Sequence, residues 1–209
     1  MARVYVARHG ETTWNLAGRY QGRRESALSG LGVRQGIALA GAFAQTRTLE
    51  RIVSSPLLRC HATAKFVGDA LDLEVETDER LIEIAHGTWE GRLREEIAAN
   101  DPERYRTWRH DPARVGFEGG ETLLDVQARW REFAEHFDAS RETLVVTHDA
   151  IVRVALLAQT GGPLDDFWKM PVENAGYAVF EVDRGWRLIE PCVNAHLATS
   201  RADIAGQAL

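Results

Sequence analysis

The first third of the chain alternates between short apolar runs and helical patterns of apolar residues. Residues 3–8 form a mostly apolar run with β-branched members that predicts a strand. Residues 30–46 follow Ser29, a good N-cap, and predict a helix with apolar residues at helical spacing: Val33, Ile37, Ala40 and Ala44. Residues 51–55 and 57–71 predict a second strand and a second helix. The order strand, helix, strand, helix indicates a parallel α/β sheet.

The second half of the chain continues the alternation. Residues 79–83 form a short strand-like piece. Residues 142–148 are the most strand-like segment of the chain, and a helix over 151–159 follows them, so we expect a central parallel strand here. Residues 177–182 and 186–189 flank an Asp-Arg-Gly turn and predict a hairpin at the edge of the sheet. Residues after about 195 are expected to form a loosely held tail.

The intervening segment, residues 92–120, loses this alternation. It is rich in arginine, acidic and aromatic residues, and its prolines and glycines favour short surface helices. Thr122 and Asp125 then form a capping box, which opens a helix with one apolar face: Leu123, Val126, Trp130, Phe133 and Phe137. We therefore predict that residues 1–209 form a single α/β domain. It is a three-layer sandwich, in which helices flank a mostly parallel central sheet and residues 86–120 form a helical cap over its carboxyl edge.

The composition narrows the class of protein. With 44% hydrophobic and 27% charged residues over 209 positions, the chain has ordinary globular values. Its 31 acidic against 25 basic residues leave a net charge of −6, which predicts no overall attraction to nucleic acid or to anionic membranes. The two cysteines, Cys60 and Cys192, have no metal-site spacing. No signal-peptide core or membrane-length apolar run is present, so a cytoplasmic protein is predicted.

Two of the seven histidines follow predicted strands directly. His9 and His148 each stand at the carboxyl end of an apolar strand that begins a strand-turn-helix unit. Ligands bind at this edge in open α/β sheets. Either histidine alone would be equally compatible with a structural role, but the pair favours a functional site. The other five lie on predicted helices or loops, where a solvated or locally hydrogen-bonded role is the better interpretation.

Two arginines are predicted at the same edge. Arg8 precedes His9, and Arg59 lies in the first turn of the helix that follows the second strand. A helix N-terminus with an arginine is a good anion site. If the strands are neighbours, two arginines and two histidines would form a pocket for a tetrahedral dianion. No P-loop, nucleophile elbow or zinc helix occurs, so we predict neither a metal nor a cofactor.

Several short motifs of the chain resemble those of a known family. Arg8-His9-Gly10-Glu11-Thr12, continued by Trp14-Asn15 and Gln21-Gly22, resembles the signature of the histidine phosphatase superfamily, in its phosphoglycerate-mutase-like branch. Further motifs in the same order extend the resemblance over nearly the whole chain: Ser54-Ser55-Pro56 with Arg59 and Thr63-Ala64, Glu83 before Gly87 and Trp89-Glu90-Gly91, Gly120-Glu121-Thr122, and Val146-Thr147-His148.

The resemblance implies a role for each matching residue. His9 would be the nucleophile that becomes phosphohistidine, and Arg8, Arg59 and His148 would hold the phosphoryl oxygens. Glu83 would protonate the leaving oxygen and then activate the attacking water. Substrate-side contacts would come from three further residues: Asn15, Gln21 and Gly22.

Two positions depart from the family pattern. Asp149 stands where many members have glycine, and it brings a negative charge close to a dianion site. His86 stands where the family often has another residue, and we expect it to cap its loop rather than to contact substrate.

The resulting hypothesis is a metal-independent phosphatase of a small phosphorylated metabolite. A phosphoglycerate mutase is the first alternative, although residues 86–120 lack the adjacent arginines that mutases carry. A non-catalytic module that binds phosphorylated ligands is the alternative of another class. The sequence identifies neither the substrate nor the oligomeric state, and it is compatible with a homo-oligomer. Five arginines of the cap are candidates for substrate contact: Arg92, Arg94, Arg106, Arg109 and Arg114.

Overall fold

The computed structural model describes residues 2–46, 48–200 and 207 of the chain. Within these residues, six strands form one sheet in the order β3-β2-β4-β1-β5-β6. Their bounds are β1 Ala2–Arg8, β2 Arg51–Ser54, β3 Val75–Thr77, β4 Thr143–Thr147, β5 Tyr177–Val182 and β6 Trp186–Val193. The strands β1 to β4 are parallel to one another, whereas β5 runs antiparallel to β1, and β6 runs antiparallel to β5. This confirms the mostly parallel sheet with a closing hairpin at its edge.

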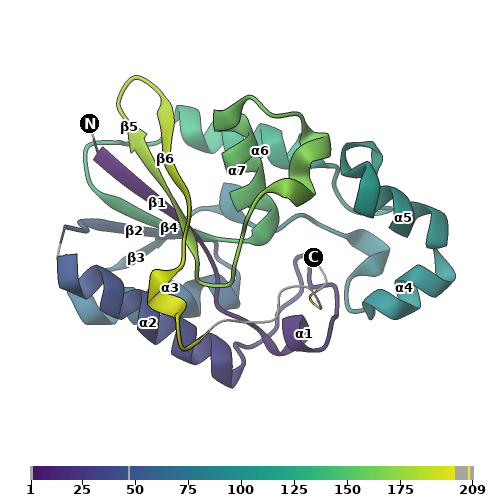
Figure 1. The fold of residues 1–209 in the computed structure, drawn as a ribbon, viewed down its shortest axis with the longest axis horizontal. Coiled ribbons are helices and arrows are strands. Elements are labelled where there is room, and N and C mark those ends of the chain that lie inside the picture. Colours follow the sequence, from purple (N-terminus) through teal and green to yellow (C-terminus); the bar gives the residue numbers. More distant parts are fainter. Residues whose placement is uncertain (1, 47, 201–206, 208–209) are drawn as a thin grey trace.

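Helices cover both faces of the sheet and give the predicted three layers (Figure 1). The helices α2 (Gly30–Thr46) and α3 (Leu58–Leu71) lie on one face, and α6 (Leu123–Glu135) and α7 (Asp149–Thr160) lie on the other. The remaining helices are short: α1 Thr13–Leu16, α4 Arg94–Asn100 and α5 Pro102–His110. Single 3-10 turns span Glu79–Leu81 (η1), Gly87–Trp89 (η2), Pro112–Arg114 (η3), Leu164–Lys169 (η4) and Ala195–Leu197 (η5).

The strand β4 shows why this arrangement is stable. All five of its residues are buried, since helices pack on both sides of it. Leu144 and Val146 face the core formed with α2 and α3, whereas Val145 faces the core formed with α6 and α7. Alternating side chains of one apolar strand thus fill two cores. This places His148, which follows β4 directly, between neighbouring strands at the carboxyl edge.

The short helices α4 and α5 lie at the side of the molecule opposite to the start of β1 (Figure 1). They confirm the expectation of short helices between residues 92 and 120. They are not only a surface feature, because Ile97 and Trp108 are fully buried in the core that α6 and α7 share. The indole of Trp168 on η4 donates a 2.6 Å hydrogen bond to the carbonyl of Trp108.

The predicted strand over residues 79–83 is wrong. The Asp78 side chain accepts a hydrogen bond from the backbone amide of Arg80 and starts the 3-10 turn η1 instead. The edge strand β3 lies just before it, and its residues are largely exposed, so they carry no alternating apolar signal.

The predicted apolar face of α2 is only partly correct, although the bounds of the helix are correct. Ala40 is buried, but Val33 and Ile37 are 37% and 56% exposed. The side that packs on α3 contains Gly36, where a Cβ would lie 2.4 Å from the Phe66 ring. Close contact between the two helices therefore depends on a residue without a side chain, which apolar periodicity does not detect.

The C-terminal region is held more firmly than its sequence suggests. Leu197 is fully buried, and the Gln35 side chain donates a 2.9 Å hydrogen bond to the carbonyl of Ser200. Residues 201–206 and 208–209, the rest of the expected loose tail, lie outside the described residues. Among the helices that the structure describes, none is long and apolar enough to cross a membrane.

Candidate active site

The structure brings together the two histidines that follow β1 and β4. The two strands are adjacent and parallel, and the Arg8 Cα pairs in register with that of Thr147. The rings of His9 and His148 consequently face each other with centroids 5.3 Å apart. Both side chains are almost completely buried. The juxtaposition predicted from the ends of two strands is therefore present.

The His9 ring is held in one tautomer by its own loop. Its Nδ1 lies 2.7 Å from the carbonyl of Gly10, and because a carbonyl only accepts, Nδ1 must carry the proton. Burial, followed by the positive charges of Arg59 and Arg8, lowers the pKa of His9 well below its ordinary value. The ring is thus neutral near pH 7, with an unprotonated Nε2, which is the form that a nucleophile requires.

The second histidine is oriented by a hydroxyl and a thiol. The His148 Nε2 lies 2.8 Å from the Ser55 Oγ and 3.3 Å from the Cys60 Sγ. Ser55 follows β2, and Cys60 lies on α3, so the adjacent parallel strand and its helix fix this ring. Burial lowers the pKa of His148 well below its usual value, with the charge of Arg59 as the next cause.

Arg8 and Arg59 are buried beside the histidines and have acceptors from the protein. The Arg59 guanidinium donates to the carbonyls of Gly22 (2.7 Å) and Arg24 (2.9 Å). Arg8 donates from Nη2 to the Gln207 side-chain oxygen at 2.8 Å, and its Nη1 lies 3.0 Å from an Asp149 carboxylate oxygen. The Nε atoms of both arginines are buried without a partner among the described residues. Each guanidinium therefore keeps an unused donor.

Glu83 is the acidic group of the cluster. It is 5% exposed, and the backbone amide of Ile84 donates to its Oε1 at 2.9 Å. Burial raises the pKa of Glu83 to about 7, which Arg59 opposes and Asp149 reinforces. A carboxyl group with this pKa can give and take a proton near neutral pH.

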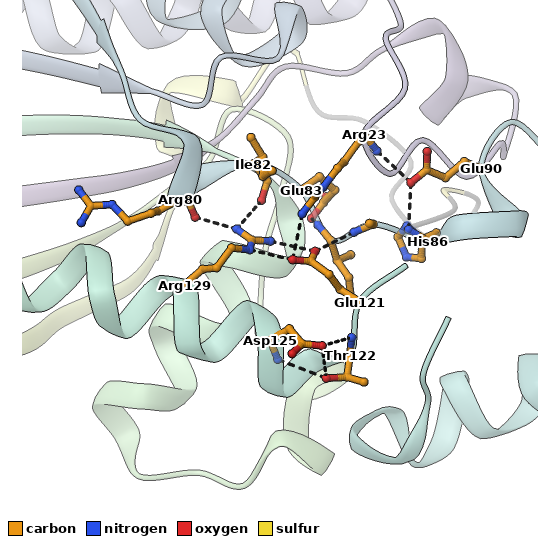
Figure 2. A network of polar contacts seen from close by, with 12 residues as sticks. Arg23, Arg80, Ile82, Glu83, His86, Glu90, Glu121, Thr122, Asp125 and Arg129 are labelled. Atoms are coloured by element: carbon orange, nitrogen blue, oxygen red, sulfur yellow. Dashed lines mark hydrogen bonds and ion pairs between the residues drawn. The ribbon is translucent and has the colours of Figure 1, made fainter. Parts of the chain in front are cut away.

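A network of polar contacts holds the Glu83 loop on both sides of that residue (Figure 2). Arg129 of α6 donates to the carbonyls of Arg80 (2.7 Å) and Ile82 (3.1 Å), and it also forms a bidentate pair with Glu121. Glu121 in turn accepts from the backbone amide of Ala85 at 2.9 Å. Both flanks of Glu83 are thereby attached to α6, which fixes its position relative to the histidines.

The three predicted substrate-side residues lie on α1 and in the loop that follows it. The side-chain oxygens of Asn15 and Gln21 lie 3.0 and 2.9 Å from the Thr12 hydroxyl, and Asn15 forms the capping box of α1. Gly22 has a φ of +52°, and a Cβ there would lie 2.1 Å from a Glu90 carboxylate oxygen. Glycine suits this position because the backbone is left-handed and the Glu90 side chain occupies the place of a Cβ.

His86 does not have the local role expected from its sequence. It stands at the N-cap of η2, but its side chain makes no capping hydrogen bond. The fully buried ring packs edge-on against Tyr20, Trp108 and Phe117 instead, with neither nitrogen hydrogen-bonded to a described residue. Burial lowers the pKa of His86 to about 3, so the ring is neutral.

Several residues of the site have no predicted role in it. Asp149 is expected only as a charge that conflicts with an anion, and Ser55 is part of a family motif without a role of its own. Three further residues are absent from the predicted site: Arg153, Cys60 and Gln207. The one sequence signal for Asp149 and Arg153 was their spacing, four residues apart on one predicted helix. Nothing local connects Gln207 to Arg8, which lies 199 positions earlier in the chain.

The arrangement combines a neutral imidazole, two buried guanidinium groups and a carboxyl group with a raised pKa. Fixed positive charge around an in-line nucleophile suits phosphoryl transfer. Within the described part of the chain, no group of three or more histidine, cysteine or acidic side chains could hold a metal ion.

A family model described as the histidine phosphatase superfamily (branch 1) matches residues 4–193. The chain is 37% identical over 186 residues to phosphoserine phosphatase 1 of Hydrogenobacter thermophilus, with 88% of each chain covered.

Two solved structures are similar over their whole length. YhfR of Bacillus stearothermophilus superposes with a TM-score of 0.85 at 30% identity, covering 94% of this chain and 100% of its own. The mycobacterial glucosyl-3-phosphoglycerate phosphatase, solved with VO3, superposes with a TM-score of 0.82 at 31% identity, covering 91% and 98%.

Proposed function

The chain belongs to branch 1 of the histidine phosphatase superfamily, and we propose that it hydrolyses a small phosphorylated metabolite through a phosphohistidine formed on His9. The observation that carries this proposal is the neutral His9 ring, with its proton on Nδ1, beside two buried arginines. Relatives named as phosphatases of phosphoserine and of glucosyl-3-phosphoglycerate support the substrate class.

In the first half-reaction, the lone pair of the His9 Nε2 forms a bond to phosphorus while the bond from phosphorus to the ester oxygen breaks. Glu83, protonated, gives its proton to the leaving oxygen. Arg8, Arg59 and His148 bind the phosphoryl oxygens, which occupy the unused Nε donors of the two arginines and replace an uncharged protein acceptor. Gln207 is that acceptor, since its side-chain oxygen accepts from Arg8.

In the second half-reaction, water attacks the phosphorus of phosphohistidine and the bond between nitrogen and phosphorus breaks. The Glu83 carboxylate takes a proton from that water, which returns the carboxyl group to its starting form. His9 regains its lone pair and inorganic phosphate leaves. One carboxyl group of raised pKa thus serves both half-reactions, because it alternates between acid and base.

The decisive experiment is a panel of phosphate esters, assayed for release of inorganic phosphate. It should include phosphoserine, glucosyl-3-phosphoglycerate, both phosphoglycerates and an aryl phosphate. We expect hydrolysis of the aryl phosphate and of at least one metabolite. Sustained interconversion of the phosphoglycerates with negligible hydrolysis would establish the mutase instead. Folded protein that releases no phosphate from any ester but binds phosphorylated ligands would establish the non-catalytic module.

Removing metals is expected to leave the activity unchanged. In the proposed reaction, two arginines supply the charge stabilisation that magnesium supplies in kinases. The measurement is aryl phosphate hydrolysis before and after dialysis against EDTA. Activity that is lost on dialysis and regained with one particular ion would contradict the proposed reaction.

The pH dependence follows from the raised pKa of Glu83. The acid form is needed for the first half-reaction, and it is lost as pH rises through about 7. For an alkyl phosphate, kcat/KM should therefore fall about tenfold per unit above that pH. Below about pH 6 the substrate becomes a monoanion, so the maximum should lie between about 6 and 7. A profile that is flat from pH 6 to 9 would remove Glu83 as the acid.

Three further expectations from the sequence stay predictions. We propose that residues 86–120 act as a cap of the single domain and contribute to substrate selection. A cytoplasmic location and a homo-oligomer are compatible with the chain.

A further inference from the structure

Asp149 forms a buried bridge between two arginines. It is the first residue of α7, directly after His148, and it is 1% exposed. One carboxylate oxygen lies 3.0 Å from the Arg8 Nη1, and the other accepts a hydrogen bond from the Arg153 Nε. A charge with so little access to water must be paired, and here both of its oxygens are paired.

Arg153 is itself held in place by the end of η4. Its Nη1 donates to the carbonyls of Phe167 and Met170, at the end of η4. Its guanidinium lies over the rings of Phe167 and Trp168, at 5.4 and 5.3 Å from their centroids. The carboxylate of Asp149 is therefore attached to a cation that the surrounding chain cannot easily release.

The bridge determines which atoms of Arg8 face the pocket. With Nη1 attached to Asp149, Nη2 and Nε remain for other acceptors. Nη2 bonds to the uncharged Gln207 side chain, and Nε has no partner among the described residues. These two donors form one edge of the guanidinium, which is the edge that binds two oxygens of a phosphate.

We propose that Asp149 is a positioning residue for Arg8. Through its bridge to Arg153, it fixes the guanidinium so that Nε and Nη2 face the phosphoryl group. This inference rests on the proposed function, because it assigns the partner of a phosphate-binding arginine. The charge of Asp149 does not conflict with an anion, since Arg153 balances it. The Asp149–Arg153 pair therefore orients the Arg8 guanidinium.

The first test is Asp149→Asn, which removes the charge and keeps the size. We expect the KM for an aryl phosphate and the inhibition constant of inorganic phosphate to rise together by about 10- to 100-fold, as for other residues that orient a ligand-binding group. The value of kcat should change by less, because Asp149 does not contact the reacting atoms. The matched control is Glu76→Gln, which removes an arginine-paired carboxylate on the edge strand β3 and should leave both constants unchanged.

The second test repeats Asp149→Asn in an Arg8→Met background, with inorganic phosphate inhibition as the readout. If Asp149 acts through Arg8, the second substitution should change the constant by less than about twofold. Tighter phosphate binding in that background would show that Asp149 acts only through its charge. An equal loss in both backgrounds would show a structural role. Either result overturns the proposal.

Two further measurements separate failure of this inference from a misfolded variant and from failure of the proposed function. If Asp149→Asn does not fold, Arg153→Lys replaces it as the test. This variant keeps the charge and loses the carbonyl contacts, so it should raise the KM and the phosphate inhibition constant by a smaller factor. Unchanged constants in this variant would overturn the proposal. If the wild-type protein hydrolyses no ester, the proposed function fails. If the wild type is active and Arg8→Met binds phosphate normally, the phosphate role of Arg8 fails, and the inference about Asp149 fails with it.

Discussion

Replacing His9 with alanine is expected to abolish turnover while leaving the fold intact. The nucleophile has no substitute, because His148 is already held by Ser55, so the loss of kcat should be about 10⁴-fold or more. The backbone of His9 keeps its contacts, since its amide donates to Thr147 and its carbonyl accepts from Asn174. Among the described residues, the His9 side chain hydrogen-bonds to Gly10 of its own loop.

The measurements are steady-state hydrolysis, thermal unfolding and detection of phosphohistidine after a rapid acid-free quench. The wild type should carry a phosphoryl group that mass spectrometry locates on His9, and the variant should carry none. A suitable control is His136→Ala, because that histidine is exposed at the end of α6 and its ring bonds to the local carbonyl of Glu132. Near-normal activity in the His9 variant, or a label on His148, would remove His9 from its role.

Replacing Glu83 with glutamine is expected to slow transfer to His9 by about 10²- to 10⁴-fold with alkyl phosphates. Glutamine keeps an oxygen that accepts from the Ile84 amide, so the loop should hold its position. It cannot give a proton to the departing alkoxide. Inorganic phosphate should bind as in the wild type, because the arginines and histidines are untouched.

The size of the defect should depend on the leaving group. An aryl oxygen departs readily without a proton, so phosphorylation by an aryl phosphate should be slowed much less than phosphorylation by an alkyl phosphate. The attacking water still lacks its base, and phosphohistidine should therefore accumulate after a burst of the aryl alcohol. Pre-steady-state kinetics with the two ester types measure both effects.

Glu90→Ala, which removes the accepting oxygens, is the control for Glu83→Gln. Glu90 follows in the same region and accepts from the backbone amides of His86 and Arg23, so its loss disturbs the loop without removing an acid (Figure 2). That variant should lose activity equally with both ester types. If Glu83→Gln behaves in the same way, with weaker phosphate binding and no leaving-group selectivity, Glu83 only maintains the shape of the pocket.

Local patterns were reliable where one segment determines its own structure. The apolar run before His148 is buried on both faces, and the capping box of Thr122 and Asp125 starts α6 as predicted. The patterns failed where a distant neighbour decides the outcome. The contact face of α2 depends on Phe66 of α3, which lies against Gly36. The wrong strand over residues 79–83 is a separate, local error, because Asp78 caps the turn η1 two residues before Arg80.

The sequence by itself determined the parallel α/β fold and the positions of His9 and His148 at its carboxyl edge. Strand and helix periodicity are local, and parallel strands must all end at the same edge. Only the tertiary structure decided the electrostatics of that edge. The pKa of Glu83 is raised by burial, and Asp149 is neutralised by an arginine on each side, one of them 141 positions away in the chain. Desolvation and charge pairing depend on which distant groups pack together, and these are properties of the folded chain.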